Sequence, residues 1–202
     1  MNVRLLHTFC RWLNESSFPI EDWTNEATLQ NQLGLFLNQW LPRESRVALE
    51  VNVPKLLGIK EKLTKKEADL MITADNVHSA VEVKFWKDAG TYNIGMFRCY
   101  EDIAFLEDLV RLGFADSFLL FFTTIKQHRE KALKKPSPRN VENYPLYKSF
   151  RFDQVLERKV RIKTGQLDQE VEIGGKYPIE WTHLRGDVWY TAISVSSQGL
   201  LI

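Results

Sequence analysis

Cysteine is scarce in this chain, and long hydrophobic runs are missing. Its 202 residues include only two cysteines, Cys10 and Cys99, far apart in the sequence. A small secreted domain usually carries a denser, even-numbered disulfide framework, so we expect two reduced, buried thiols in an intracellular protein. The most apolar stretch, residues 118–122, has the length of a strand and is too short to cross a bilayer.

The first residues also lack the features of a signal peptide. His7, Arg11 and Asn14 interrupt any apolar core there, and no small-residue cleavage site follows. Internal repeats and low-complexity segments are absent as well. We therefore expect a soluble, cytoplasmic protein without a membrane partner.

Neither glycine nor proline is abundant, with 10 and 7 residues. Hydrophobic residues make up 44% of the chain, charged residues 26% and aromatic residues 12%. This composition excludes an intrinsically disordered, collagen-like or coiled-coil protein. The length suits one domain over residues 1–202 with a core able to stabilise itself.

The net charge is only +1, but the basic and acidic residues are unevenly distributed along the chain. Residues 126–163, which we call the basic segment, hold 12 basic and 4 acidic residues. The rest of the chain holds 15 basic and 22 acidic residues. The neutrality of the whole chain is therefore a cancellation between two regions.

Several familiar chemical motifs are missing. Residues 174–176 read Gly-Gly-Lys but lack the remainder of a phosphate-binding loop. No Gly-x-Ser-x-Gly nucleophile elbow appears. Zinc-ligand spacing is absent from the four histidines, which are His7, His78, His128 and His183.

Hydrophobic periodicity and capping residues predict a series of helices and strands. The predicted helices cover residues 5–13, 25–40 and 91–112, and the predicted strands cover residues 47–53, 67–74, 79–86 and 117–124. A charged loop is expected over 55–66 and a five-residue hairpin connection over 75–79. Beyond these we predict a short basic helix over 127–135, and strand pairs 159–163 with 170–173 and 179–184 with 188–195.

The chemically informative residues are charged side chains inside two strands that are otherwise apolar. Glu82 and Lys84 flank Val83, and because side chains alternate along a strand they project from the same face. If the two strands form a hairpin, Asp69 lies opposite Glu82 or Lys84, depending on the register. Two carboxylates on rigid strands can bind Mg²⁺, which activates water and offsets charge on a phosphodiester, and a lysine can orient that water.

The Asp/Glu-x-Lys triplet is not specific by itself. It recurs at residues 157–159, in a charged segment without an apolar strand, where we interpret it as a solvated charge cluster. A structural ion pair is the alternative for Glu82 and Lys84. Charged residues are seldom placed in apolar strands without a partner or a function, so we favour the functional interpretation.

Asp69, followed after twelve intervening residues by Glu82-x-Lys84, resembles the motif of the PD-(D/E)xK nuclease superfamily. The resemblance covers about residues 24–124, in the order helix, three strands, helix, strand. It implies an α/β, restriction-endonuclease-like core, with a mixed central sheet flanked by helices. The basic segment and a predicted β-rich extension over 164–202 follow this core in the sequence. The resemblance also implies that Asp69, Glu82 and the Val83 carbonyl bind Mg²⁺ or Mn²⁺, and that Lys84 assists the attacking water. Members often carry a further glutamate on the first core helix, and Glu26 resembles it.

Other residues fit the resemblance less closely. Ala68 stands where the motif has proline, and residues 85–87 identify no particular subfamily. Glu50, on the first predicted strand, is either an additional ligand or an edge-exposed carboxylate. Gln30 is a candidate for orienting groups near Glu26, although glutamines are common on helix surfaces.

The basic segment is a candidate nucleic-acid interface because cations neutralise phosphates and its interleaved aromatic residues can stack on unpaired bases. The alternative is a solvated basic loop whose aromatic residues dock on the core. Lysines in the loop before Asp69 can share the same surface. The residues that we assign to nucleic-acid binding are Lys65, Lys66, Lys126, Arg129, Lys131, Lys134 and Lys135.

The sequence therefore predicts a metal-dependent nuclease that hydrolyses phosphodiester bonds, with DNA favoured over RNA as the substrate. A homodimer is one of the oligomeric states that the sequence leaves open. One alternative is a non-catalytic nucleic-acid-binding module on the same fold. The other is an interaction scaffold that binds no nucleic acid.

Overall fold

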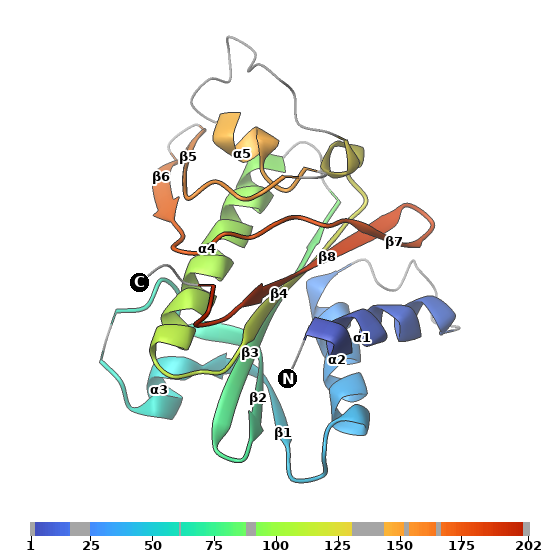
Figure 1. The fold of residues 1–202 in the computed structure, drawn as a ribbon, viewed down its shortest axis with the longest axis vertical. Helices are drawn as coiled ribbons and strands as arrows, with labels where there is room; N and C mark the ends of the chain where they lie inside the picture. The colour runs from blue at the N-terminus through green and yellow to red at the C-terminus, as the bar shows by residue number, and fades with distance from the viewer. Residues whose placement is uncertain are drawn as a thin grey trace.

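A mixed six-stranded sheet forms the centre of the structure, a computed structural model shown in Figure 1. Its strands are β1 (Arg46–Asn52), β2 (Glu67–Ala74), β3 (Val77–Trp86), β4 (Ser117–Thr123), β7 (Thr182–Arg185) and β8 (Val188–Val195), in the order β1-β2-β3-β4-β8-β7. Only β3 and β4 are parallel neighbours within this sheet. The structure describes residues 3–16, 25–60, 62–87, 92–130, 144–151, 154–164 and 167–199.

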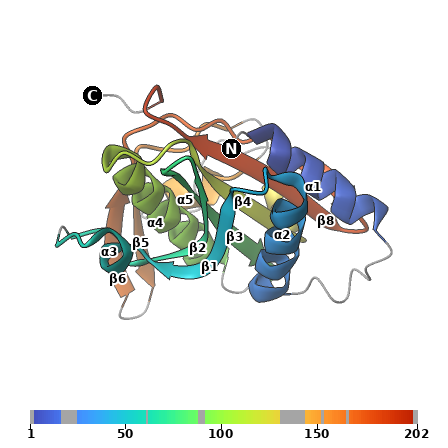
Figure 2. The same ribbon diagram turned by 90° about the horizontal axis from the view of Figure 1, so that it is seen from below.

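Helices cover both faces of the sheet (Figure 2). The helices α1 (Val3–Glu15) and α2 (Glu26–Trp40) pack on one face, and α4 (Tyr92–Arg111) packs on the other. Beside α4 lie the short helix α5 (Tyr144–Lys148) and a separate hairpin of β5 (Lys159–Thr164) and β6 (Leu167–Glu172). The remaining short elements are α3 (Val53–Leu57), after β1, and the 3₁₀ helix η3 (Lys126–Arg129), after β4.

Side-chain alternation on the central strands divides the core into two layers. On β3, Val81 and Val83 face α1 and α2, whereas Ala80 belongs to the layer around α4. The same alternation directs Glu82 and Lys84 toward α4. All residues of β4 are buried, which confirms the prediction of a strand covered on both faces.

The predicted elements of the first 124 residues are present at nearly the predicted positions. Asn25 caps α2, because its side chain accepts a hydrogen bond from the Thr28 N–H at 2.7 Å. Gly113, with φ of 94°, follows the end of α4, as expected for a residue just past a helix. The three helices and four strands predicted there are confirmed.

Three connections differ from the prediction. Asp75 and Asn76 have φ of 51° and 63°, and this left-handed backbone joins β2 to β3 in two residues instead of five. The helix α3 was not predicted: Val53 was expected to end the strand 47–53, and residues 55–57 were expected in the charged loop. The helix forms because the Asn52 side chain caps the Lys55 N–H at 3.0 Å and Pro54 lies in the first turn. The helix predicted over 127–135 is a 3₁₀ helix over 126–129, and residues 131–143 lie outside the described part.

The C-terminal strands complete the central sheet. Both predicted strand pairs are present, as β5 with β6 and β7 with β8, with shifted bounds. The second pair is not a separate extension, because β8 pairs antiparallel with β4 from Ser117↔Val195 to Thr123↔Trp189. β8 therefore covers the edge of β4 that faces away from β3.

Two expectations from the composition can be compared directly with the structure. Cys10 and Cys99 are buried free thiols, as predicted, and burial raises the pKa of each. Among the described helices, none combines the length and apolarity that crossing a membrane would need.

His128 follows β4 and is buried in an uncharged form. The Thr123 hydroxyl donates to the Trp86 carbonyl at 2.9 Å, so it accepts from Nδ1 of His128 at 2.8 Å. The imidazole stacks on Trp181, with ring centroids 5.5 Å apart. Burial, together with the positive charge of Arg151, lowers the pKa of His128 to about 3.

We therefore expect an acid destabilisation that depends on His128. Between its ordinary pKa of 6.5 and the folded value of about 3, the unfolded chain binds a proton that the folded chain does not. The free energy of unfolding consequently decreases as the pH falls through this window. Between about pH 7.5 and about pH 5, the native chain should lose about 2 kcal/mol more than His128→Gln, measured by urea unfolding at each pH. Parallel pH profiles of the two proteins would contradict a buried neutral imidazole.

Candidate active site

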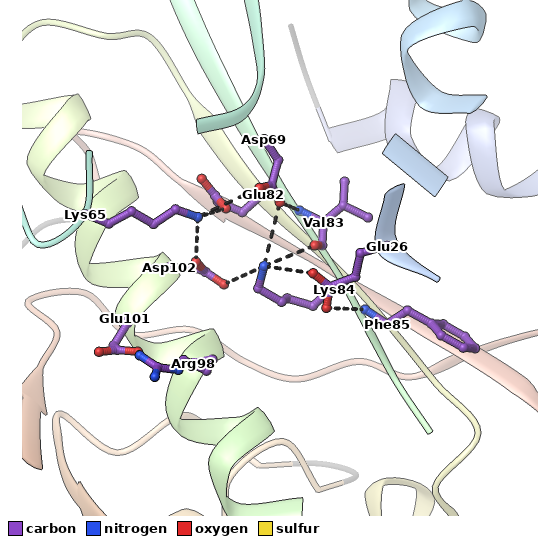
Figure 3. A network of polar contacts seen from close by, with 10 residues as sticks. All are labelled: Glu26, Lys65, Asp69, Glu82, Val83, Lys84, Phe85, Arg98, Glu101 and Asp102. Carbon is purple, nitrogen blue, oxygen red and sulfur yellow. Dashed lines mark hydrogen bonds and ion pairs between the residues drawn. The ribbon is translucent and has the colours of Figure 1, made fainter. Parts of the chain in front are cut away.

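The candidate site lies where β2 and β3 part. Their pairing ends at Leu70↔Val81, and beyond this point β2 no longer occupies the edge of β3. The Val83 N–H instead donates to Oδ2 of Asp69 at 2.8 Å, and the Phe85 N–H donates to Oε1 of Glu26 at 3.4 Å (Figure 3). Two carboxylates from different elements thus take the place of a neighbouring strand, and the backbone of β3 holds them in position.

Lys84 lies at the centre of one group of charges (Figure 3). Its Nζ is 3.4 Å from Oε2 of Glu26, 3.7 Å from Oδ2 of Asp69 and 3.5 Å from Oδ2 of Asp102. The same ammonium donates to the Val83 carbonyl at 3.3 Å. Carboxylates from α2, β2 and α4 therefore meet at one lysine of β3.

Lys65, in the loop before β2, forms a second centre. Its Nζ donates to Oε2 of Glu82 and to Oδ1 of Asp102, the latter at 3.0 Å, and lies 3.9 Å from Oδ1 of Asp69. Together the two lysines connect four carboxylates, which we call the charged cluster: Glu26, Lys65, Asp69, Glu82, Lys84 and Asp102. Two ammonium groups against four carboxylates leave an excess of acidic groups.

Burial and mutual repulsion alter the titration of the charged cluster. Glu82 is fully buried, and this burial, together with the nearby charges of Asp102 and Asp69, raises its pKa well above the usual range. Burial lowers the pKa of Lys65 and Lys84, but the surrounding carboxylates outweigh it and leave both pKa values above that of a free lysine. Both lysines are therefore held as cations.

The donor atoms of the charged cluster fit a hard divalent cation. They are carboxylate oxygens, which Mg²⁺ and Mn²⁺ prefer, and within the described residues Oε1 of Glu82 and Oδ2 of Asp102 are buried without a hydrogen-bond partner. Across the described ranges, no three His, Cys, Asp or Glu side chains are already gathered as ligands of one ion. Here lysine ammonium groups stand between the carboxylates instead.

A cavity of about 420 Å³ opens beside the charged cluster. This volume is within the range of small-molecule sites in proteins. The cavity gives the two lysines and two of the carboxylates access to an incoming ligand. Its lining residues are Glu26, Thr64, Lys65, Lys84, Trp86, Arg98, Glu101 and Asp102.

The four residues that we predicted for catalysis lie together. Glu26, Asp69, Glu82 and Lys84 all belong to the charged cluster. The backbone of Val83, predicted to provide a carbonyl ligand, contacts both Asp69 and Lys84.

The two additional candidates lie apart from these contacts. Glu50 is an exposed residue of β1 with φ of 51°, and Gln30 is a half-buried residue of α2. Among the contacts of the described residues, none is a hydrogen bond or ion pair between either side chain and the charged cluster. Their assignment as additional ligands gains no support from the geometry.

The residues assigned to nucleic-acid binding belong only in part to the described residues. Lys65 lies in the charged cluster and Lys66 is exposed beside it. Lys126 is exposed, and the Arg129 guanidinium lies over the Trp189 ring, 5.5 Å from its centroid. Three of the assigned residues lie outside the described part: Lys131, Lys134 and Lys135.

Acidic residues of β6 offset part of the positive charge of the basic segment. Because β5 and β6 pair, side chains of opposite sign face one another across the hairpin. The ion pairs are Arg158–Glu172 at 2.9 Å, Lys159–Glu170 at 2.7 Å and Arg161–Asp168 at 2.6 Å. The acidic partners lie just beyond residue 163, so a count along the chain assigns them to a different region.

Asp102 belongs to the charged cluster but was not identified by the sequence analysis. It is 3% exposed on α4, and its neighbours one turn away on the same face are the buried residues Cys99, Phe105 and Leu106. A carboxylate at a buried position of an amphipathic helix is a signal that helical spacing alone can reveal. The contact partners of that carboxylate require the tertiary structure.

No protein-family model, curated protein or solved structure matches this chain. The candidate site is therefore defined by its own residues: the carboxylates at the parting of β2 and β3, and the two lysines that connect them.

Trp86, in the wall of the cavity, is fixed by close packing against Gly95 of α4. A Cβ atom at Gly95 would lie 2.4 Å from the indole atoms Cδ2 and Cε2. At Gly34 of α2, by contrast, the nearest atom to an added Cβ is a flexible Leu49 methyl carbon at 3.4 Å. The two helix glycines therefore differ in how much space they offer a side chain.

We expect Gly95→Ala to lower the free energy of unfolding by about 1–3 kcal/mol, because the methyl group overpacks the Trp86 ring. Gly34→Ala is the matched control and should be neutral or stabilising by up to about 1 kcal/mol, through the higher helix propensity of alanine. Chemical denaturation of both variants and the parent chain measures the difference. Equal effects of the two substitutions would contradict the close packing of Trp86.

Proposed function

We propose that this chain is a divalent-metal-dependent nuclease with a restriction-endonuclease-like core, which hydrolyses phosphodiester bonds, in DNA by preference. The observation that carries the proposal is the convergence of Glu26, Asp69, Glu82 and Lys84 where β2 and β3 part, beside a cavity of about 420 Å³. The order α2, β1, β2, β3, α4, β4, with the short helix α3 between β1 and β2, supports the proposed core.

The acidic residues supply the metal-binding part of this site. Asp69 and Glu82, together with the Val83 carbonyl, would hold the ion, and their rigid positions on adjacent strands favour a defined geometry. A bound Mg²⁺ or Mn²⁺ would supply Lewis-acid chemistry, by lowering the pKa of a water molecule and offsetting charge on the scissile phosphate.

Lys84 and Glu26 supply the orienting part. The Lys84 ammonium is held among Glu26, Asp69 and Asp102, at the wall of the cavity. In this position it donates hydrogen bonds to the attacking water or to a phosphate oxygen and offsets charge that develops there. Glu26 aligns Lys84 by accepting a hydrogen bond from its ammonium. The Phe85 N–H donates to the other oxygen of Glu26 and so holds this carboxylate against β3.

A non-catalytic nucleic-acid-binding module on the same fold is the second candidate. One observation favours it: each of the four carboxylates already has a lysine partner within 4 Å. A network of buried ion pairs can serve structure alone, by satisfying charges that would otherwise be buried unpaired. The two candidates differ in turnover and in the effect of neutralising Asp69.

We expect the purified chain to cleave DNA only when Mg²⁺ or Mn²⁺ is present. Asp69→Asn and Glu82→Gln remove metal-binding charge, and Lys84→Met removes the donor to the reacting groups, so each should reduce the cleavage rate about 100-fold or more. Glu67→Gln is the matched control, because Glu67 is an exposed carboxylate two residues before Asp69 on the same strand. Labelled single-stranded, duplex and branched DNA, with RNA in parallel, provide the measurement.

Three results would decide against the nuclease or against the site proposed for it. Salt-dependent DNA binding that persists in Asp69→Asn, without turnover of any substrate, would establish the binding module instead. Failure to cleave any DNA or RNA form with either metal, combined with no detectable Mn²⁺ binding, would overturn the proposed metal site. Cleavage that survives Lys84→Met at the native rate would place the chemistry elsewhere.

A further inference from the structure

Three carboxylates of the charged cluster converge on the ammonium group of Lys65. Its Nζ donates to Glu82 and to Asp102 and lies 3.9 Å from Asp69, so β2, β3 and α4 each contribute one carboxylate. A hard divalent cation also requires several carboxylate oxygens around one positive centre. Lys65 therefore stands at a position suited to an ion.

This ammonium leaves the buried oxygens around it incompletely satisfied. Oε1 of Glu82, a fully buried side chain, has no hydrogen-bond partner among the described residues. Within the same described residues, Oδ2 of Asp102 has no hydrogen bond, and its one ion-pair contact is with the Lys84 ammonium at 3.5 Å. Unpaired buried carboxylate oxygens are costly, and an ion with several coordination positions can satisfy more of them than one lysine does.

The Lys65 side chain can leave this position without movement of its backbone. On one side, the backbone and hydroxyl of Thr64 donate to Asp108 of α4 at 2.9 and 2.8 Å. On the other side, the Lys66 carbonyl accepts from the Val53 N–H at 2.9 Å. The Lys65 side chain itself is 27% exposed and lines the cavity, so rotation about its own bonds can carry the ammonium out of the cluster.

We infer that Lys65 is an internal cation of the metal-free site, and that a divalent ion takes its place among Asp69, Glu82 and Asp102 and displaces its ammonium into the cavity. The inference rests on the proposed function, because it concerns the metal site of that nuclease. It adds Asp102 as a ligand and assigns Lys65 a regulatory role, in which it competes with the metal and offsets part of the negative charge of the carboxylates.

Lys65 variants test the competition. Lys65→Met removes the competing charge, so Mn²⁺ affinity measured by calorimetry should rise about tenfold or more. The matched control is Lys66→Met, a neighbouring exposed lysine, which should change the affinity by less than about twofold because its charge is screened by solvent. Thermal unfolding with and without Mn²⁺ shows whether each variant is folded in the titration.

Asp102 is tested in the same titration. Asp102→Asn should weaken Mn²⁺ binding about tenfold or more, because it removes a ligand charge. Glu101→Gln provides the control, since Glu101 lines the same cavity from the same helix but pairs with Arg98 at 2.6 Å. Equal affinities in these two variants would remove Asp102 from the ligand set.

The displacement itself is measured on the native chain and needs no variant. Amine acetylation followed by mass spectrometry reports how exposed each lysine is. Addition of Mn²⁺ should increase labelling of Lys65 several-fold, because its ammonium leaves the carboxylates, while Lys66 labelling stays constant. This measurement holds even if Lys65→Met fails to fold.

The outcomes separate the inference from the proposed function. Mn²⁺ binding that is lost in Glu82→Gln, with Lys65 labelling unchanged or decreased by the metal, would overturn the displacement and leave the nuclease proposal standing. Absence of Mn²⁺ binding in the native chain and in Lys65→Met would overturn both. Increased Lys65 labelling together with tighter binding to Lys65→Met supports both.

Discussion

The hydrogen bond from the Val83 N–H to the Asp69 carboxylate lies where the pairing of β2 with β3 ends and the candidate site begins. Beyond Leu70, β2 no longer pairs with β3, and a side chain replaces the backbone of the missing strand. In the same way, the Glu26 carboxylate accepts the hydrogen bond of the Phe85 N–H in place of a strand backbone. Because buried backbone groups require partners, these bonds hold both carboxylates at the edge of β3. The gap left by β2 is the space in which carboxylates from three other elements can meet Lys84 and Lys65.

Charge balance is the second constraint on this region. Four carboxylates within reach of one another can be tolerated in a partly buried site only if cations lie between them, and Lys65 and Lys84 fill that role. Both lysines line the cavity, but Lys84 projects from β3 and is held among Glu26, Asp69 and Asp102, whereas Lys65 comes from the loop before β2. The same acidic excess that requires the lysines would favour a divalent ion, which links the stability of the charged cluster to the chemistry that we propose for it.

Charge counted along the chain and charge in the folded structure give different descriptions of the basic segment. Three of its cations face acidic residues across the β5–β6 hairpin, so the positive excess over 126–163 is partly neutralised by residues that follow it. The four strands of the first 124 residues, by contrast, were predicted accurately, because alternation and buried runs are local properties. The turn between β2 and β3 was predicted too long, because the left-handed conformations of Asp75 and Asn76 bring the strands together in two residues.

The sequence by itself determined that Glu82 and Lys84 share one face of a strand, because side chains alternate with a period of two, and that Asp69 lies on the strand before them. It determined the three long helices, α1, α2 and α4, in the same way, through their apolar periodicity and caps. Only the tertiary structure decided that Asp102 and Lys65 complete the charged cluster and that β8 pairs with β4. Hydrophobic periodicity predicts which face of a helix or strand is buried, but it does not predict which residue of another element packs against that face. Lys65 and Asp102 are 37 residues apart, and only packing of α4 against the sheet brings them into contact.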